Sequence, residues 1–246
     1  MDKPFVLIPL YIYPLHEAWE PLFQVASAHP EVRFIAVVNP NNGPGSEPLP
    51  DASYMAVLER LSKVPNICTL GYVHCTYGER DIDAITADID VYCRWNDALA
   101  VEGIFFDEVP SQVRFVPFMA GLADHTRVTW KMHCNKDCMV VYNPGVVVDR
   151  GFFEHPDYIV VFEQSHGHWD DSFIDKQLQR VSVETRSKSV AIIHSCEARG
   201  SKVESFTKQV CSLGVAGIFV TDELDGGYTK WPATWKRFAG TVAGIT

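Results

Sequence analysis

The sequence predicts an α/β protein that forms a single TIM-type (β/α)8 barrel, and three observations support this fold class. Short apolar runs rich in β-branched and aromatic residues recur along the chain, as in the buried strands of a parallel sheet. Segments of helical character separate them, which implies right-handed crossovers. Eight such runs fit within 246 residues, close to the usual length of an eight-stranded barrel. No linker or change of composition divides the chain, so residues 1–246 are predicted to form one domain.

Each predicted strand is an apolar run that ends in polar or turn-forming residues. The expected strands are residues 5–11, 32–38, 67–73, 103–107, 138–142, 158–162, 190–193 and 216–220. The expected helices are residues 17–28, 54–61, 81–95, 111–123, 173–181, 202–213 and 233–242. The first helix stops before Pro30, and the helix over 81–95 carries acids in its first turn, which suits the helix dipole. The alternative is an open, doubly wound sheet, but no glycine-rich dinucleotide fingerprint follows the first strand.

Composition narrows the possible partners. Hydrophobic residues make up 47% of the chain and the formal net charge is −10, which allows a substantial core and argues against nucleic acid as a partner. No run reaches the roughly 18 apolar residues of a membrane span. The apolar run at residues 5–14 contains two prolines and lacks a small-residue cleavage site, so it is interpreted as a strand rather than a signal segment. As written, the chain is expected to be cytoplasmic, or secreted if a leader has been trimmed.

The seven cysteines stand at irregular spacing. In a chain of this length they do not form a disulfide framework, and buried reduced thiols are the simpler interpretation. His133, Cys134 and Cys138 lie close together in sequence, but no second ligand pair at zinc spacing follows them.

Two adjacent carboxylates, Asp107 and Glu108, end the fourth predicted strand. In α/β folds, ligands and catalytic groups collect at the carboxyl ends of the strands. Either acid could instead cap the helix that follows. Because side chains alternate along a strand, the two are not expected to point the same way, and Asp107 is the first choice for chemistry.

Polar and aromatic residues follow the other strands and should line the same mouth. The candidate substrate-binding residues are Tyr11, Asn39, Asn41, His74, Tyr77, Asn143, His194 and Asp222, with Trp95 and Trp169 on or near the same loops. Amides and acids bond to hydroxyl groups, and aromatic faces accept the apolar face of a sugar ring. The pattern favours an oligosaccharide or polysaccharide as the substrate.

Glycoside hydrolysis suits such a mouth because it needs two carboxyl groups on opposite sides of the scissile bond. Asp107 or Glu108 on the fourth strand and Glu163 on the sixth lie two strands apart, across a substrate-sized gap. A separation of about 5–5.5 Å would indicate retention of configuration, and about 6.5–9.5 Å inversion.

Other constellations are weaker. Asp222 and Glu223 compete with the acids of the fourth strand, although loop solvation or capping is the simpler interpretation. His166 and His168 resemble a metal pair but stand in a polar loop. A metal-dependent hydrolase built on histidines therefore remains a minor alternative, and no cofactor or metal is expected. No nucleophile elbow or phosphate loop is present.

Six motifs in order resemble the spherulin-4 (spherulation-specific) proteins of fungi and slime moulds, which belong to glycoside hydrolase family 135. They are VLIPLYIYP (6–14), VVNPNNGPG (37–45), GYVH (71–74), GIFFDE (103–108), YNPG (142–145) and VVFE (160–163). The resemblance spans roughly the first two-thirds of the chain and continues more faintly to the eighth strand.

The resemblance implies a (β/α)8 fold and endo-acting hydrolysis of a microbial polysaccharide that contains galactosamine or N-acetylgalactosamine. The acidic residues of the family fall on Asp107, Glu108 and Glu163. The leading hypothesis is a retaining hydrolase in which Asp107 is the nucleophile or ion-stabilising carboxylate, Glu163 the general acid/base and Glu108 a supporting partner. The chain departs from the family in lacking an evident secretion signal. The alternative is a non-catalytic carbohydrate-binding barrel of the same fold.

Overall fold

A computed structural model describes residues 3–95, 99–178 and 181–245 of the chain. Eight strands follow one another along this part of the sequence. They are β1 (Phe5–Leu10), β2 (Phe34–Val38), β3 (Ile67–His74), β4 (Val101–Asp107), β5 (Met139–Tyr142), β6 (Tyr158–Ser165), β7 (Ser189–His194) and β8 (Gly217–Val220). Their side chains are mostly buried on both faces, which accounts for the near-continuous apolar runs in the sequence.

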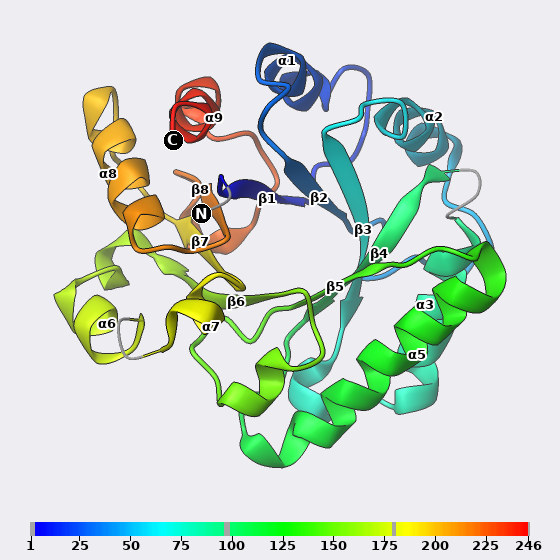
Figure 1. The fold of residues 1–246 in the computed structure, drawn as a ribbon. Coiled ribbons are helices and arrows are strands. Elements are labelled where there is room, and N and C mark those ends of the chain that lie inside the picture. The colour runs from blue at the N-terminus through cyan, green and yellow to red at the C-terminus, as the bar shows by residue number, and fades with distance from the viewer. Residues whose placement is uncertain (1–2, 96–98, 179–180, 246) are drawn as a thin grey trace.

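The strands pair in parallel, in the order of the sequence, and close into a barrel. β1 completes the ring by pairing with both β2 and β8. The helices lie around the outside of the strands (Figure 1). The predicted (β/α)8 fold class is therefore confirmed.

The helices of the described residues differ more from the prediction than the strands do. They are α1 (Glu20–Ala28), α2 (Ala52–Leu61), α3 (Ile82–Arg94), α5 (Val116–Cys134), α6 (Asp171–Lys176), α7 (Val183–Arg186), α8 (Ser201–Ser212) and α9 (Trp235–Ala243). α5 starts later and runs eleven residues further than the predicted helix over 111–123, because Pro117 favours a start at the first turn. Its later turns bury Thr126 and Thr129, and these polar residues obscure the apolar periodicity.

The region after β6 was predicted as one helix over 173–181. The structure instead has α6 followed by the separate short helix α7. Residues 179–180 of the predicted helix lie outside the described residues. Ser182 caps α7 by accepting a hydrogen bond from the Thr185 amide, which gives this helix its own start.

One close approach in the barrel wall fixes the position of β4. A Cβ atom at Gly103 would lie 1.9 Å from the Met139 carbonyl oxygen on β5. β4 and β5 therefore pack together at a distance that only glycine allows at this position. Among the described residues, no helix is long and apolar enough to cross a bilayer.

Candidate active site

The carboxyl end of β4 carries Asp107 into the mouth of the barrel. β4 lies between β3 and β5, and Asp107 is in register with His74 of β3. The chain turns sharply directly after Asp107, because Glu108 adopts a left-handed conformation with φ 50°. This turn ends the strand between the two acids and separates their side chains.

Asn143 joins the two carboxylates that the sequence predicted to act together. Its side-chain nitrogen donates to Asp107 Oδ1 at 2.7 Å and also to Glu163 Oε2. Asn143 is itself held firmly, because its backbone amide donates to the Phe106 carbonyl oxygen and its side-chain Oδ1 accepts from the Gly145 backbone amide. Since one nitrogen reaches both carboxylates and a hydrogen bond spans about 3 Å, the nearest carboxylate oxygens are at most about 6 Å apart.

Three tyrosines surround this carboxylate pair. The Tyr72 hydroxyl bonds to Asp107, and the Tyr228 hydroxyl donates to Glu163 Oε1 at 2.7 Å. The Tyr11 ring packs edge-on against both, with centroid distances of 5.5 Å to Tyr72 and 5.8 Å to Tyr228. Burial is the largest cause that raises the pKa of Tyr11, Tyr72 and Tyr228 well above the ordinary value of a phenol. The three phenols therefore stay protonated and can serve as hydrogen-bond donors.

The surroundings of Asp107 favour its neutral form. Loss of solvent, and then the nearby charge of Glu163, raise the pKa of Asp107 to about 7. Hydrogen bonds from Tyr72 and Asn143 act in the opposite direction without cancelling this rise. Two carboxyl groups that share one amide donor are strongly coupled, so a proton bound here belongs to the pair.

Glu108 lies to one side of the pair, toward β3. Its side chain is 38% exposed, and its Oε2 is 3.8 Å from His74 Nδ1. Burial and then Arg80 lower the pKa of His74, so this contact is not a permanent ion pair. The Tyr77 amide donates to the Glu108 carbonyl oxygen, and the Tyr77 side chain stands 62% exposed beside the acids. Glu108, His74 and Tyr77 thus form the β3 side of the mouth.

The predicted amides after β2 have different surroundings. Asn39 accepts a hydrogen bond from the Gly43 amide at 2.9 Å, which shapes the loop. Asn41 is exposed and shares a shallow cleft of about 310 Å³ with His74. The ion pair Arg80–Asp88, at 2.7 Å, forms part of the same cleft. The cleft meets the acids at His74, so Asn41 and His74 are the predicted binding residues that extend the mouth on this side.

The predicted residues after β7 and β8 make contacts within and between the two loops that follow these strands. His194 Nδ1 lies 2.9 Å from the Ser195 hydroxyl. Asp222 accepts from Arg199 at 3.0 Å and from the Ala233 amide at 2.9 Å, so both of its oxygens are engaged. The contacts of Asp222 hold the long segment that follows β8. This segment contains Tyr228 and brings it to Glu163.

The expectation that Trp95 and Trp169 offer rings at the mouth was wrong. Trp95 is fully buried and donates to the Pro48 carbonyl oxygen. Trp169 packs against Phe162 and Phe173, with centroid distances of 4.8 Å and 5.1 Å. Both indoles belong to the core because the helices and loops that carry them fold back against the barrel. The rings at the mouth are tyrosines.

The histidines of the β6 loop contact Ser165 at the end of β6 and Phe206 of α8. His168 Nδ1 lies 2.8 Å from the Ser165 hydroxyl, and the His166 ring packs edge-on against Phe206. Among the described residues, no group of three or more His, Cys, Asp or Glu side chains is arranged to hold a metal ion.

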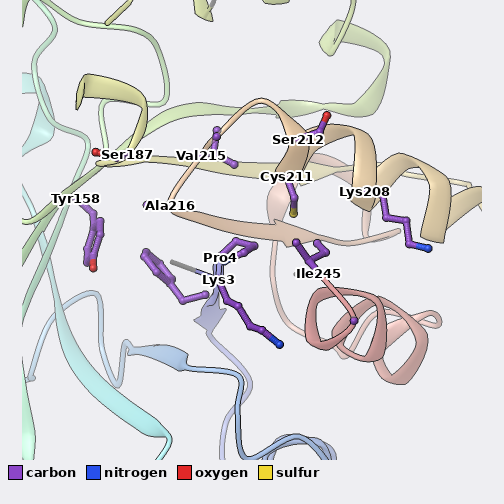
Figure 2. Close-up of a pocket in the computed structure, with 13 residues that line it drawn as sticks. Lys3, Pro4, Tyr158, Ser187, Lys208, Cys211, Ser212, Val215, Ala216 and Ile245 are labelled. Atoms are coloured by element: carbon purple, nitrogen blue, oxygen red, sulfur yellow. The ribbon is translucent and has the colours of Figure 1, made fainter. Parts of the chain in front are cut away.

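A separate cavity of about 620 Å³ opens at the opposite end of the barrel, where β1, β6, β7 and β8 begin. Figure 2 shows Tyr158 on one side of this cavity and Cys211 and Lys208 on the other. Its lining contains no carboxylate among the described residues. The bridged carboxylate pair therefore lies outside this cavity.

Two residues of the carboxylate cluster were missed by sequence reasoning. Tyr72 precedes His74 by two positions in β3, so strand alternation places both on the same face and could have indicated it. Tyr228 follows Gly226 and Gly227 in an irregular segment, where no periodicity indicates a direction. Its approach to Glu163 is a product of the tertiary fold.

The carboxyl-terminal mouth of this parallel eight-stranded barrel holds a bridged carboxylate pair among tyrosines, and glycoside hydrolysis uses such a pair of carboxyl groups. Residues 5–242 match the sequence profile of the spherulation-specific family 4. The chain therefore belongs to that family, and the family predicted from the six motifs is confirmed.

Two relatives illustrate this membership. The chain is 29% identical over 225 residues to spherulin-4 of Physarum polycephalum, covering 90% of this chain and 64% of that longer protein. It is 33% identical to Aspergillus clavatus Sph3, crystallised in complex with GalNAc, with a TM-score of 0.90 and 98% of each chain covered. A chitinase from Chromobacterium violaceum has a TM-score of 0.61 at 11% identity over 99% of this chain and all of its own, which is a likeness of fold alone.

Proposed function

We propose that this protein is a retaining, endo-acting glycoside hydrolase whose substrate is a microbial polysaccharide containing galactosamine or N-acetylgalactosamine. The observation that carries the proposal is the single Asn143 nitrogen that bonds to both Asp107 and Glu163. It holds the carboxyl groups within about 6 Å of each other, nearer to the separation typical of retaining enzymes than to that of inverting ones. The GalNAc complex of the Aspergillus clavatus relative supports the choice of sugar.

The surroundings of the two acids indicate which is the general acid and which is the nucleophile. Glu163 accepts hydrogen bonds on both oxygens, from Tyr228 and from Asn143, and these two donors hold its carboxylate in a fixed orientation. Asp107 is desolvated and has a pKa raised to about 7, which favours the protonated form near neutral pH. We therefore assign Asp107 as the general acid and Glu163 as the nucleophile, the reverse of the roles expected from the sequence. Glu108 contacts the sugar from the β3 side.

The function is tested by turnover of a partly N-acetylated galactosamine polymer, followed by the release of reducing ends and by product size. Asp107→Asn and Glu163→Gln should each reduce turnover at least about 1,000-fold, because the pair acts as a unit. Glu204→Gln, which alters an exposed ion pair with Arg237, is the matched control and should leave turnover unchanged. Full activity in either variant of the pair would exclude the proposed site. Binding of oligosaccharide by the wild type without any product would favour the non-catalytic alternative.

The roles within the pair are separated by azide rescue with an activated aryl glycoside of N-acetylgalactosamine. If Glu163 is the nucleophile, Glu163→Ala should give a glycosyl azide of inverted configuration, because azide attacks the sugar directly. Asp107→Ala should give an azide of retained configuration, because azide intercepts the glycosyl-enzyme intermediate. The opposite pair of products would restore the assignment expected from the sequence.

A further inference from the structure

Two thiols far from the mouth meet between neighbouring helices. Cys93 stands near the end of α3, and Cys134 is the last residue of α5. The helices lie side by side on the outside of the barrel (Figure 1). The two sulfur atoms are 3.7 Å apart, and the Cys134 thiol also lies 3.7 Å from the Cys93 carbonyl oxygen. This is van der Waals contact between sulfurs that are 41 positions apart in the sequence.

We propose that Cys93 and Cys134 form a reversible disulfide that joins α3 to α5 when the protein meets a low-molecular-weight disulfide oxidant. A sulfur–sulfur bond is about 2.05 Å long, so the two atoms need to approach by less than about 2 Å. Side-chain rotation supplies most of that movement. Because Cys134 ends its helix, ahead of Asn135 in the left-handed conformation, the backbone at this position can also adjust.

The two thiols differ in access, which sets the order of the reaction. Cys134 is partly exposed, whereas Cys93 is buried. The Cys134 thiolate attacks one sulfur of oxidised glutathione, forms a mixed disulfide and releases the first glutathione thiolate. The Cys93 thiolate then attacks the Cys134 sulfur and releases the second. In total, the two cysteine thiols lose two electrons and one glutathione disulfide gains them. The two protons of the cysteine thiols are taken up by the two glutathione thiolates that are released.

The position of the cross-link means that it should raise the stability of the fold. The closed loop runs from α3 through β4 to the end of α5, and so contains the strand that carries Asp107. Closing a loop of this length restricts the unfolded chain, which stabilises the folded state. The oxidised protein should therefore have a Tm higher by roughly 5 °C or more.

The test oxidises the purified full chain with oxidised glutathione at mildly alkaline pH and counts thiols after denaturation. The count should fall from seven to five, and the intact mass should fall by about 2 Da, the mass of two hydrogens. Tryptic digestion after alkylation should yield residues 81–94 linked to residues 132–136. These two peptides contain Cys93 and Cys134 and no other cysteine.

Matched variants make the result specific. Cys134→Ser should abolish both the linked peptide and the rise in Tm, while Cys138→Ser, four positions further on, should keep both. Reduction with dithiothreitol should return the oxidised wild type to its original Tm. Seven thiols after oxidation, or a linked peptide that contains residues 137–150 in place of 132–136, would overturn the proposal.

Discussion

Tyr228 connects the irregular segment after β8 to the carboxylate pair. Its hydroxyl donates to Glu163 Oε1 at 2.7 Å, and burial raises the pKa of this phenol, so it keeps its proton over the working pH range. A neutral donor held against a carboxylate fixes the direction of that carboxylate and stabilises its charge. Tyr228 is thus a positioning residue that acts through Glu163.

Tyr228→Phe should lower kcat by about 10- to 100-fold, the usual value of a hydrogen bond to a charged group. The acidic limb of the pH–rate profile should move to higher pH, because the ionised form of the pair loses a donor. Steady-state kinetics on the galactosamine polymer across pH measure both effects. The matched control is Tyr13→Phe, which removes a tyrosine–carboxylate bond to Asp51 on the outer loops. An unshifted profile with reduced kcat would contradict the positioning role.

At the level of single residues, the sequence predicts what stands at the end of a regular strand. Asp107, Asn143 and Glu163 could be found because parallel strands deliver their carboxyl ends to one mouth. Tyr228 could not, since its path depends on Asp222 and Glu223, whose carboxylates hold the loop after β8 through Arg199, Ala233 and Thr229. The same limit explains the tryptophans, which lie near the predicted loops in sequence but pack into the core.

At the level of elements, β4, the strand that ends in Asp107, packs closely against β5 at Gly103. Gly103→Ala would place a methyl group 1.9 Å from the Met139 carbonyl oxygen, so a backbone shift is unavoidable. The free energy of unfolding should fall by about 3 kcal/mol or more. Equilibrium urea unfolding measures the change.

Gly121→Ala provides the control for that substitution. Gly121 lies in α5 and is exposed, and nothing stands within 4 Å of an added Cβ. Alanine is the better helix former, so this variant should be neutral or more stable by up to about 1 kcal/mol. Equal effects of the two substitutions would show that crowding at the β4–β5 contact does not matter.

Strands were easier to predict than helices in this chain because their signal is strong and short. A strand such as β4 is buried on both faces, so its run of apolar residues can be recognised from composition alone. The later turns of α5 are hard to recognise because threonines occupy buried positions where apolar residues would be expected. Their hydroxyls bond within the helix, as Thr126 does to the Leu122 carbonyl oxygen. α6 and α7 are set apart by local caps, which a periodicity argument does not resolve.

At the scale of the whole molecule, the carboxylate pair is expected to cost stability at neutral pH. The pKa of Asp107 is about 7 in the folded state and 3.8 in its ordinary state. Below about pH 4 the group is protonated in both states, and no penalty arises. As pH rises from 4 to 7, the unfolded chain releases the proton that the folded chain keeps, so the free energy of unfolding falls. The size of the rise in pKa corresponds to at most about 4 kcal/mol.

Asp107→Asn should therefore be inactive yet more stable than the wild type at pH 8, with the difference in Tm shrinking as the pH is lowered to 4. Thermal unfolding of both proteins across this range measures the trend. Glu204→Gln, at an exposed ion pair, should show little difference from the wild type at any pH. A Tm difference that grows on acidification would contradict the raised pKa of Asp107.

The pairing of β5 and β6 has one more consequence. The two strands are in register at Val141–Tyr158 and Tyr142–Ile159, and β6 then continues to Ser165 beyond the end of its neighbour. Beyond Tyr142–Ile159, two contacts join β6 to the segment that follows β5. The Glu163 backbone amide donates to the Gly145 carbonyl oxygen, and the Asn143 side chain donates to Glu163 Oε2. Hydrogen exchange of the Glu163 amide should accordingly be fast for a barrel strand. A sugar lying across Asn143 and Glu163 would close this seam and slow that exchange, so deuterium uptake at a single amide reports on occupancy of the mouth.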